Sequence, residues 1–374
     1  MNERLHRLLD HLCETLDAGR QAQKDALYRR ALNWEPVARP PLVVTYPLPD
    51  EVRFRPYPHR EIFDDPEKML YNELVHAFDT SIALHSELGD DLPLTVRANF
   101  GTVLVASMFD APVEQTDDNP PWILHPAGRG FPLERIADTD PFDVTRGWIP
   151  RAVETMQAYH GLLDAYPALK ETIRIVLPDL QGPFDNLELV RGSEVFLDLV
   201  AAPEAVDRAM RTLATAQIGL AKHFRSWTTE PEDGYCHQHA VMLKGNILLR
   251  NDCCILVSPE MYREQIAPHD ERVLCELGGG GIHSCGEVEH LVHEWLRLPS
   301  IRSLDFGEPE RNDLDAIYAL AAPKHVPLIR IAVDEAALRS GEAWRRFPTG
   351  VVLLYRAADL EAARTIFRDQ WSYS

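Results

Sequence analysis

The feature that most constrains the fold is a repeated alternation of short apolar runs with longer helical patterns. The apolar runs lie at 94–101, 172–179, 240–252, 281–286, 301–307, 326–334 and 351–357, and 42–47 is a further candidate. Helical patterns lie near 141–168, 187–227, 258–277, 286–297, 312–323 and 335–347. This alternation predicts parallel strands joined by right-handed crossovers, and the number of units favours a single TIM-type (β/α)₈ barrel over an open sheet.

The first part of the chain has a different character. Leucines recur at helical spacing between residues 5 and 16, and a Pro-rich stretch without a clear period follows. We therefore expect an N-terminal helical and Pro-rich extension, residues 1–65, packed on a barrel formed by 66–374. A helix near 66–88 should begin with Asp65 as N-cap and Pro66 in its first turn.

Composition excludes several classes of protein. The 374 residues include 38 Lys and Arg against 58 Asp and Glu, a formal charge of −20, which argues against nucleic acids or anionic membranes as partners. No apolar run is long enough to span a membrane, and the charged start lacks the apolar centre of a signal peptide, so we expect a cytoplasmic protein. Six Cys are too few for a disulfide framework, which leaves metal binding or catalysis as uses for a thiol.

In a barrel, the residues that do chemistry lie at the carboxyl ends of the strands. Polar residues at or just after the predicted strand ends are Asn99, Asp179, Gln181, Asp185, Asp252, His283, Cys285, Asp305 and Asp334. We take Asp179, Asp252 and Asp305 as candidates for catalysis. The alternative for an aspartate in this position is that it caps the helix that follows.

The sharpest local pattern is His283-x-Cys285, at a strand end rich in glycine. Residues two apart on an extended strand point to the same side. An imidazole and a thiolate that project together form half of a zinc site, although another metal is not excluded by these ligands. The alternative is a buried Cys beside a hydrogen-bonded His.

Two further patterns add candidates. His237 and His239 would share a side of an extended segment, and either could complete a metal site, bind substrate, or simply lie in a polar loop. Asp179, Gln181 and Asp185 surround a Gly-Pro turn, which suits either substrate positioning or turn formation alone.

Taken together, these segments resemble the uroporphyrinogen decarboxylase superfamily, and within it the cobalamin-linked methyltransferase branch. The resemblance covers about residues 60 to 370 and rests on PDLQGPFDN (178–186), LVSPEMYREQIAPHDERV (256–273), GIHSCGEVEHLV (281–292) and the strand end at 303–307. It implies a (β/α)₈ barrel with one active-site cleft. It also implies zinc held by His283 and Cys285, and methyl transfer involving a corrinoid protein.

The chain departs from that pattern in two ways. The branch supplies a further Cys ligand near the last strand, but no Cys follows Cys285. Our first candidate for the missing ligand is His239, with His237 and Asp252 as alternatives. The Arg-rich substrate loop of the decarboxylase is also absent, which disfavours porphyrinogen as the substrate. Because the chain has no corrinoid-binding D-x-H-x-x-G motif, a corrinoid would be supplied in trans.

The candidate residues and the resemblance lead to three alternative functions. The leading prediction is a zinc-dependent methyltransferase that moves a methyl group between a small substrate and a corrinoid or thiol acceptor. In it, substrate would contact Asn99, Gln181, Asp185, His237 and Arg330. The second is a metal-independent decarboxylase or lyase for a carboxylated small molecule or tetrapyrrole, with Arg97 and Arg330 binding anions. The third is a barrel that binds a corrinoid or tetrapyrrole without catalysis. The sequence leaves the oligomeric state open, including a homodimer.

Overall fold

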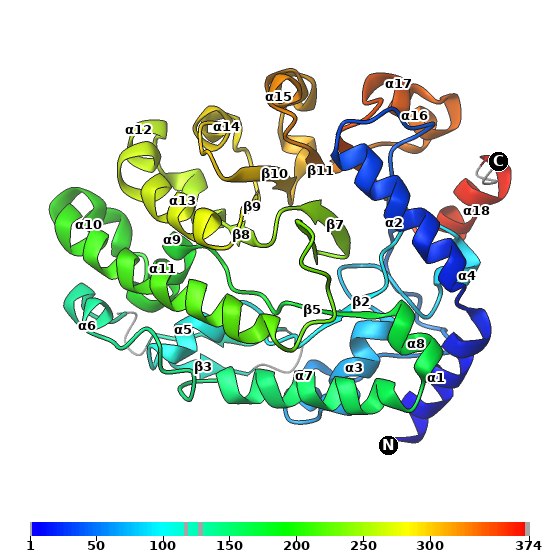
Figure 1. Cartoon of the computed structure of the whole chain (residues 1–374), viewed down its shortest axis with the longest axis horizontal. Coiled ribbons are helices and arrows are strands. Elements are labelled where there is room, and N and C mark those ends of the chain that lie inside the picture. Colours follow the sequence, from blue (N-terminus) through cyan, green and yellow to red (C-terminus); the bar gives the residue numbers. More distant parts are fainter. Residues whose placement is uncertain (1, 116–118, 126–129, 371–374) are drawn as a thin grey trace.

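A parallel sheet of six strands forms the centre of the computed structural model, which describes residues 2–115, 119–125 and 130–370 (Figure 1). Its strand order is β1-β12-β11-β10-β9-β8. These strands are β1 (Leu42–Thr45), β8 (Leu248–Arg250), β9 (Gly280–Ser284), β10 (Ile301–Phe306), β11 (Leu328–Ala332) and β12 (Val351–Arg356). Their residues are almost all buried, as expected for a parallel sheet covered by helices.

A second parallel sheet pairs β2 (Thr95–Arg97) with β5 (Arg174–Val176). Within the described residues, no strand ladder joins β1 to β2 or β5 to β8, so the strands do not form a closed barrel. Single backbone hydrogen bonds cross near both gaps. Asp91 N donates to Leu42 O at 2.9 Å, and Gly182 N donates to Arg250 O at 2.7 Å. The fold is therefore α/β with parallel strands, as the alternating pattern predicts.

Helices surround the strands on the outside (Figure 1). The longer ones are α1 (Glu3–Thr15), α2 (Ala18–Leu32), α3 (Pro66–Val75), α7 (Ile149–Asp164), α9 (Pro183–Arg191), α11 (Pro203–Arg225), α13 (Ala267–Glu276), α15 (Leu314–Ala321) and α18 (Leu360–Gln370). The shorter ones are α4 (His85–Leu88), α5 (Leu104–Met108), α6 (Leu133–Ala137), α8 (Pro167–Thr172), α10 (Val195–Ala201), α12 (Pro259–Met261), α14 (Glu289–Trp295), α16 (Glu335–Ser340) and α17 (Glu342–Arg346). Among the described residues, no helix combines the length and apolar character needed to cross a membrane.

The helix expected over 66–88 begins as predicted but ends early. The Asp65 side chain accepts hydrogen bonds from the backbone N–H groups of residues 67 and 68, with Pro66 in the first turn. The helix stops at Val75, because the chain then turns through Phe78 and Asp79, which both have positive φ. Such a backbone cannot continue a right-handed helix. The segment 76–84 is instead a loop.

The N-terminal region contributes to the sheet as well as covering it. Four leucines of α1 are fully buried, which agrees with the predicted amphipathic helix. The strand β1 lies within residues 1–65 and pairs in parallel with β12. The central sheet therefore begins before residue 66.

A hairpin lies between α11 and β8. The pattern of apolar residues did not predict it as a separate element. Its strands are β6 (Tyr235–Gln238) and β7 (Val241–Lys244), and Gln238 pairs with Val241. The two residues of the turn, His239 and Ala240, have φ values of 52° and 59°. Positive φ at both positions is typical of a type I′ turn. Strand β7 contacts β9, β10 and β11, so the hairpin packs against the central sheet.

Candidate active site

The site is built around His283, which lies on β9 directly beside Asp305 on β10. Register-paired residues of neighbouring parallel strands point to the same face of the sheet, so the two side chains meet. His283 Nδ1 lies 2.9 Å from Asp305 Oδ2. The same Nδ1 lies 3.1 Å from Arg330 Nη2. An ionised carboxylate only accepts hydrogen bonds and a guanidinium only donates them, so Asp305 favours a proton on Nδ1 whereas Arg330 favours a lone pair there.

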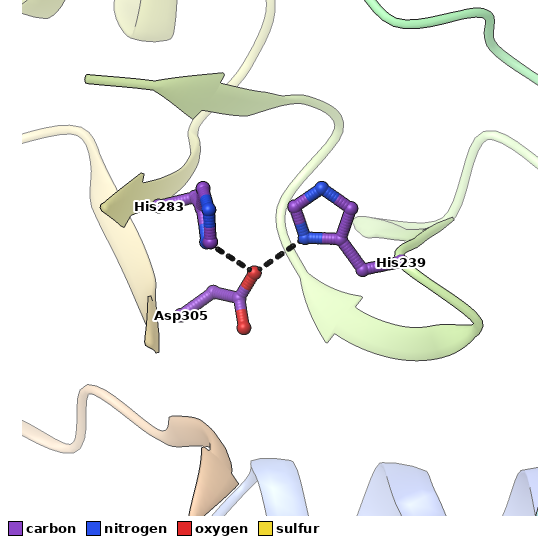
Figure 2. Close-up of side chains that lie close together, drawn as sticks. All are labelled: His239, His283 and Asp305. Carbon is purple, nitrogen blue, oxygen red and sulfur yellow. Dashed lines mark hydrogen bonds and ion pairs between the residues drawn. The ribbon is translucent and has the colours of Figure 1, made fainter. Parts of the chain in front are cut away.

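A second imidazole reaches the same carboxylate from the hairpin turn (Figure 2). His239 Nδ1 donates to Asp305 Oδ2 at 2.7 Å, so one oxygen contacts both histidines. The two rings are 4.6 Å apart between centroids and nearly perpendicular. The left-handed backbone of His239 costs roughly 1 kcal/mol or more for a residue other than glycine. The turn that places His239 here is therefore maintained by the structure around it.

Arg330 completes this set of side chains, which we call the buried cluster: His239, His283, Asp305 and Arg330. Arg330 donates to Asp305 through Nε at 2.6 Å and through Nη2 at 3.0 Å. Its φ is 61°, and the pairing of β11 with β12 shifts register between Leu328 and Ile331. This β-bulge is a device that re-aims a side chain, and here it accompanies the Arg330 contact with Asp305.

Burial and charge set the protonation of this cluster. Burial alone would raise the pKa of Asp305, but Arg330 and the two imidazoles hold that pKa well below its usual range. Burial, and next the charge of Arg330, lower the pKa of His239 to about 3. At neutral pH Asp305 is thus an anion and His239 is neutral. The buried cluster therefore combines one ionised hydrogen-bond acceptor, Asp305, with two imidazoles held in fixed orientations.

The other nitrogen of His283 faces a different group, which we call the open triad: Asp252, His283 and Cys285. His283 Nε2 lies 3.5 Å from Cys285 Sγ and 3.5 Å from Asp252 Oδ1. Asp252 Oδ1 also accepts a hydrogen bond from Cys285 N at 2.7 Å. Cys285 is exposed and the Asp252 side chain is 40% exposed, whereas that of Asp305 is fully buried. The open triad is therefore partly exposed to solvent through Asp252 and Cys285.

The thiol of the open triad is not activated by its protein surroundings. Burial, and next the Asp252 carboxylate, raise the pKa of Cys285 to about 12. The bare thiol is therefore protonated at neutral pH. Since a bound metal ion deprotonates a coordinating thiol, the arrangement suits a metal ligand better than a free nucleophile.

Two potential metal-binding groups share His283: His239 with Asp305, and Asp252 with Cys285. In each group the ligand atoms lie within 4.8 Å of one another. Of the residues that the structure describes, no such group joins His239 to Cys285. The structure thus brings the predicted ligands His283 and Cys285 together with Asp252, whereas it brings His239 to Asp305.

The loop that carries Asp252 is held in place by hydrogen bonds to buried carboxylate side chains. Asp185, in the first turn of α9, accepts from Asp252 N at 2.9 Å and Cys253 N at 3.0 Å. Next to it, Asn251 Nδ2 donates to Asp270 Oδ2 at 2.6 Å, and the Tyr262 hydroxyl donates to the same oxygen at 2.8 Å. Asp185 therefore lies beneath the open triad and orients its backbone.

A third polar group lies at the ends of β2 and β8. Asp179 makes ion pairs with Arg97, at 3.8 Å, and with Arg250. Arg97 Nε lies 3.7 Å from Glu73 Oε2, and Asn99 Nδ2 donates to Glu73 Oε1 at 2.8 Å. Two of the predicted residues, Asp179 and Asn99, therefore belong to a network of buried arginines and carboxylates.

The remaining predicted residues lie elsewhere. His237 contacts Glu230 Oε1 through Nδ1 at 2.8 Å and Arg174 through Nε2 at 3.2 Å, apart from the open triad. Gln181 has a φ of 52°, and its buried side-chain oxygen has no hydrogen-bond partner among the residues that the structure describes. Asp334 caps α16 by accepting from Ala337 N at 2.7 Å, as the helix-cap alternative predicted.

Sequence reasoning missed Glu73, Phe78 and Arg250. Arg250 carried a signal, since a charged residue ends the apolar run just before Asn251 and Asp252. Glu73 lies in a helix and Phe78 in the loop after it, so only the packing of α3 beside β2 reveals them.

Comparison with known proteins identifies the fold but no family. No protein-family model and no curated protein matches the chain. Among solved structures, a methyltransferase from Methanosarcina mazei superposes with a TM-score of 0.65, covering 92% of this chain and 97% of that chain at 15% sequence identity. At this identity, the likeness shows that the two proteins share a fold.

Proposed function

We propose that this protein is a zinc-dependent methyltransferase of the uroporphyrinogen decarboxylase superfamily, with the open triad holding the metal. The general class is supported by the fold shared with a methyltransferase. The observation that carries the metal assignment is the geometry of Asp252, His283 and Cys285. Each ligand comes from the end of a central strand or from the turn that follows it, where catalytic residues of parallel α/β folds are found.

The spacing of the three ligand atoms suits zinc. Tetrahedral zinc with Zn–N and Zn–O bonds of about 2.0–2.2 Å and Zn–S of about 2.3 Å separates neighbouring ligand atoms by roughly 3.3–3.6 Å. His283 Nε2 lies 3.5 Å from both of its neighbours. A set of one nitrogen, one sulfur and one oxygen also leaves a fourth position for a substrate, as in catalytic zinc sites.

The buried cluster supplies the support that such a site requires. Metal-binding histidines usually donate their second ring N–H to a carboxylate, which fixes the tautomer and the ring orientation. Asp305 Oδ2, 2.9 Å from His283 Nδ1, is placed for that role and is itself held by Arg330. In this proposal Asp252 is the third ligand, and His239 orients Asp305 rather than binding the metal.

A metal bound here would lower the pKa of a thiol or water at the open position. In this proposal Asp185 holds the Asp252 loop, and Asp305 favours the tautomer of His283 that has its proton on Nδ1 and its lone pair on Nε2. The methyl group would pass between a small substrate and a corrinoid or thiol acceptor, with the corrinoid supplied by a partner protein. We also propose that the two parallel sheets together form an open barrel of eight strands, in which a single backbone hydrogen bond, 91–42 or 182–250, crosses each gap between the sheets.

Elemental analysis of the purified protein tests this proposal. We expect about one zinc per chain in the wild type, and loss of zinc in Cys285→Ser, His283→Ala and Asp252→Ala. The matched control is Asp334→Ala, which removes an aspartate that follows a strand but only caps α16. Retention of zinc in Asp252→Ala, together with loss in His239→Ala, would move the third ligand to His239. Wild-type protein that stays free of metal after incubation with zinc would refute the zinc mechanism.

A further inference from the structure

The buried arginines beside the site have hydrogen-bonding capacity that the described residues do not use. Arg97 Nε and Nη1 and Arg250 Nη2 are buried atoms without a hydrogen-bond partner among those residues. The two side chains are only 11% and 10% exposed. A buried charged donor without an acceptor is costly, so such groups are normally satisfied by water or by a ligand.

The contacts of Arg97 are loose for a buried guanidinium. Its distances to Glu73, 3.7 Å, and to Asp179, 3.8 Å, exceed those of a hydrogen bond. Gaps of this length are the ones that an additional oxygen acceptor can bridge. One face of the guanidinium is covered by the Phe78 ring, 4.1 Å from its centroid. The edge of the planar group is therefore the part left for an acceptor.

Arg97 borders a narrow pocket that also touches the buried cluster. Its lining includes Glu73, Phe78, Gln238 and His239. The Phe78 ring also packs against the imidazole of His239, with 5.1 Å between the ring centroids. The pocket thus connects the arginine network to the side chains behind the proposed metal, and its free space holds about one or two water-sized groups.

We propose that this pocket binds the carboxylate of the substrate, with Arg97 as its main partner and Arg250 assisting across Asp179. The inference rests on the proposed function, because it names the substrate class of the same site. A guanidinium edge offers two parallel N–H donors that match the two oxygens of a carboxylate. The limited free space favours these two oxygens over the three of a sulfonate or phosphonate.

The charges of the network agree with a single negative charge on the ligand. Arg97, Arg250 and Arg330 face Glu73, Asp179 and Asp305. Burial raises the pKa of Glu73, although Arg97 opposes this shift. Burial also lowers the pKa of Arg97 and, to about 9, that of Arg250. A bound carboxylate would offset this loss of solvation by placing a negative charge beside the two guanidinium groups.

Titration of ¹³C-labelled acetate, followed by NMR on the metal-free full-length protein, tests the proposal. We expect saturable acetate binding, no binding of neutral acetamide, and weaker binding of methanesulfonate and methylphosphonate. Arg97→Gln should weaken acetate binding at least about tenfold, the range for loss of a charge-assisted hydrogen bond. Arg211→Gln, which removes an exposed arginine on α11, is the matched control and should bind acetate as the wild type does.

Circular dichroism shows whether each variant is folded. If Arg97→Gln does not fold, Arg97→Lys replaces it, because it keeps the charge but loses the planar pair of donors and should still weaken binding. Wild-type protein that binds acetate no better than acetamide would overturn the proposal. So would a folded Arg97 variant with wild-type affinity, or tighter binding of methanesulfonate. Because the protein is free of metal, these results are independent of whether zinc binds.

Discussion

The two sides of His283 differ in almost every physical property. On the Nδ1 side, the carboxylate of Asp305 is fully buried and contacts two imidazoles and a guanidinium. On the Nε2 side, Asp252 and Cys285 are partly exposed, and each places a side-chain atom 3.5 Å from Nε2. On the closed side the groups contact one another within hydrogen-bond distance, whereas the open side has the wider spacing on which our proposed metal site rests.

In our proposal, the closed side positions the His283 ring and the open side binds the metal. Metal-binding side chains keep accurate positions only when further contacts hold them, and the closed side provides such contacts to His283. Strain is also concentrated there, since His239 and Arg330 both adopt positive φ. The comparison therefore predicts that changes on the closed side cost stability, while changes on the open side cost metal affinity.

The largest effect is expected for stability when one aspartate from each side is changed. Asp305→Asn leaves Arg330, whose side chain is only 16% exposed, without its charge partner, so it should lower the free energy of unfolding by about 3–5 kcal/mol. Asp252→Asn keeps a hydrogen-bond acceptor for Cys285 N at a partly exposed position, so it should change stability by less than about 1 kcal/mol. Urea denaturation of the metal-free proteins measures both. Equal losses would remove the distinction between the two sides.

The next effect concerns zinc affinity, measured by competition with a chromogenic chelator. Asp252→Ala removes a proposed ligand and should weaken zinc binding by more than about 100-fold, beyond the 10–100-fold range typical of outer-layer partners. His239→Gln changes only the orientation of Asp305 and should remain within that range. A larger loss in His239→Gln than in Asp252→Ala would reverse the assignment of the two sides.

A smaller effect is expected from the carboxyl group behind the open side. Burial raises the pKa of Asp270 to about 7, although Tyr262 and Asn251 oppose the shift. A raised pKa means that the folded protein holds this proton more tightly than the unfolded chain. Its contribution to stability is therefore fully present at low pH and is lost as the pH rises from about 4 to about 7.

Asp270→Asn removes this titration. The difference in unfolding free energy between variant and wild type should shift in favour of the variant by at least about 1 kcal/mol between about pH 5 and pH 8, since one pKa unit corresponds to about 1.4 kcal/mol. Urea denaturation at the two pH values measures it. An unchanged difference would show that Asp270 does not titrate in this range.

The strands could be predicted from sequence because their signal is local. Each apolar run overlaps a strand, and the run at 240–252 contains both β7 and β8, whereas β6 lies outside the predicted runs. The hairpin was hidden because its turn is His239-Ala240, without the Asn or Gly that marks a type I′ turn. Its tip bends His239 away from the extended path that would have placed it beside His237.

The site could be predicted in part. His283 and Cys285 lie together because residues two apart at the end of a strand point to the same side, and this spacing can be read from the sequence. The meeting of His283 with Asp305 depends on strand register, and the contact of Arg330 depends on a bulge. Neither the strand register nor the bulge can be recognised in the pattern of residues. The buried partners Glu73 and Arg250 likewise follow from packing between segments far apart in the chain.

X-ray absorption spectroscopy at the zinc edge, on the zinc-loaded protein, tests the central claim most directly. The account predicts one sulfur at about 2.3 Å, with the remaining nearest atoms nitrogen or oxygen at about 2.0–2.2 Å. It also predicts loss of the sulfur contribution in Cys285→Ser, with no such loss in His239→Gln. Zinc bound without any sulfur neighbour in the wild type would contradict the open triad as the metal site.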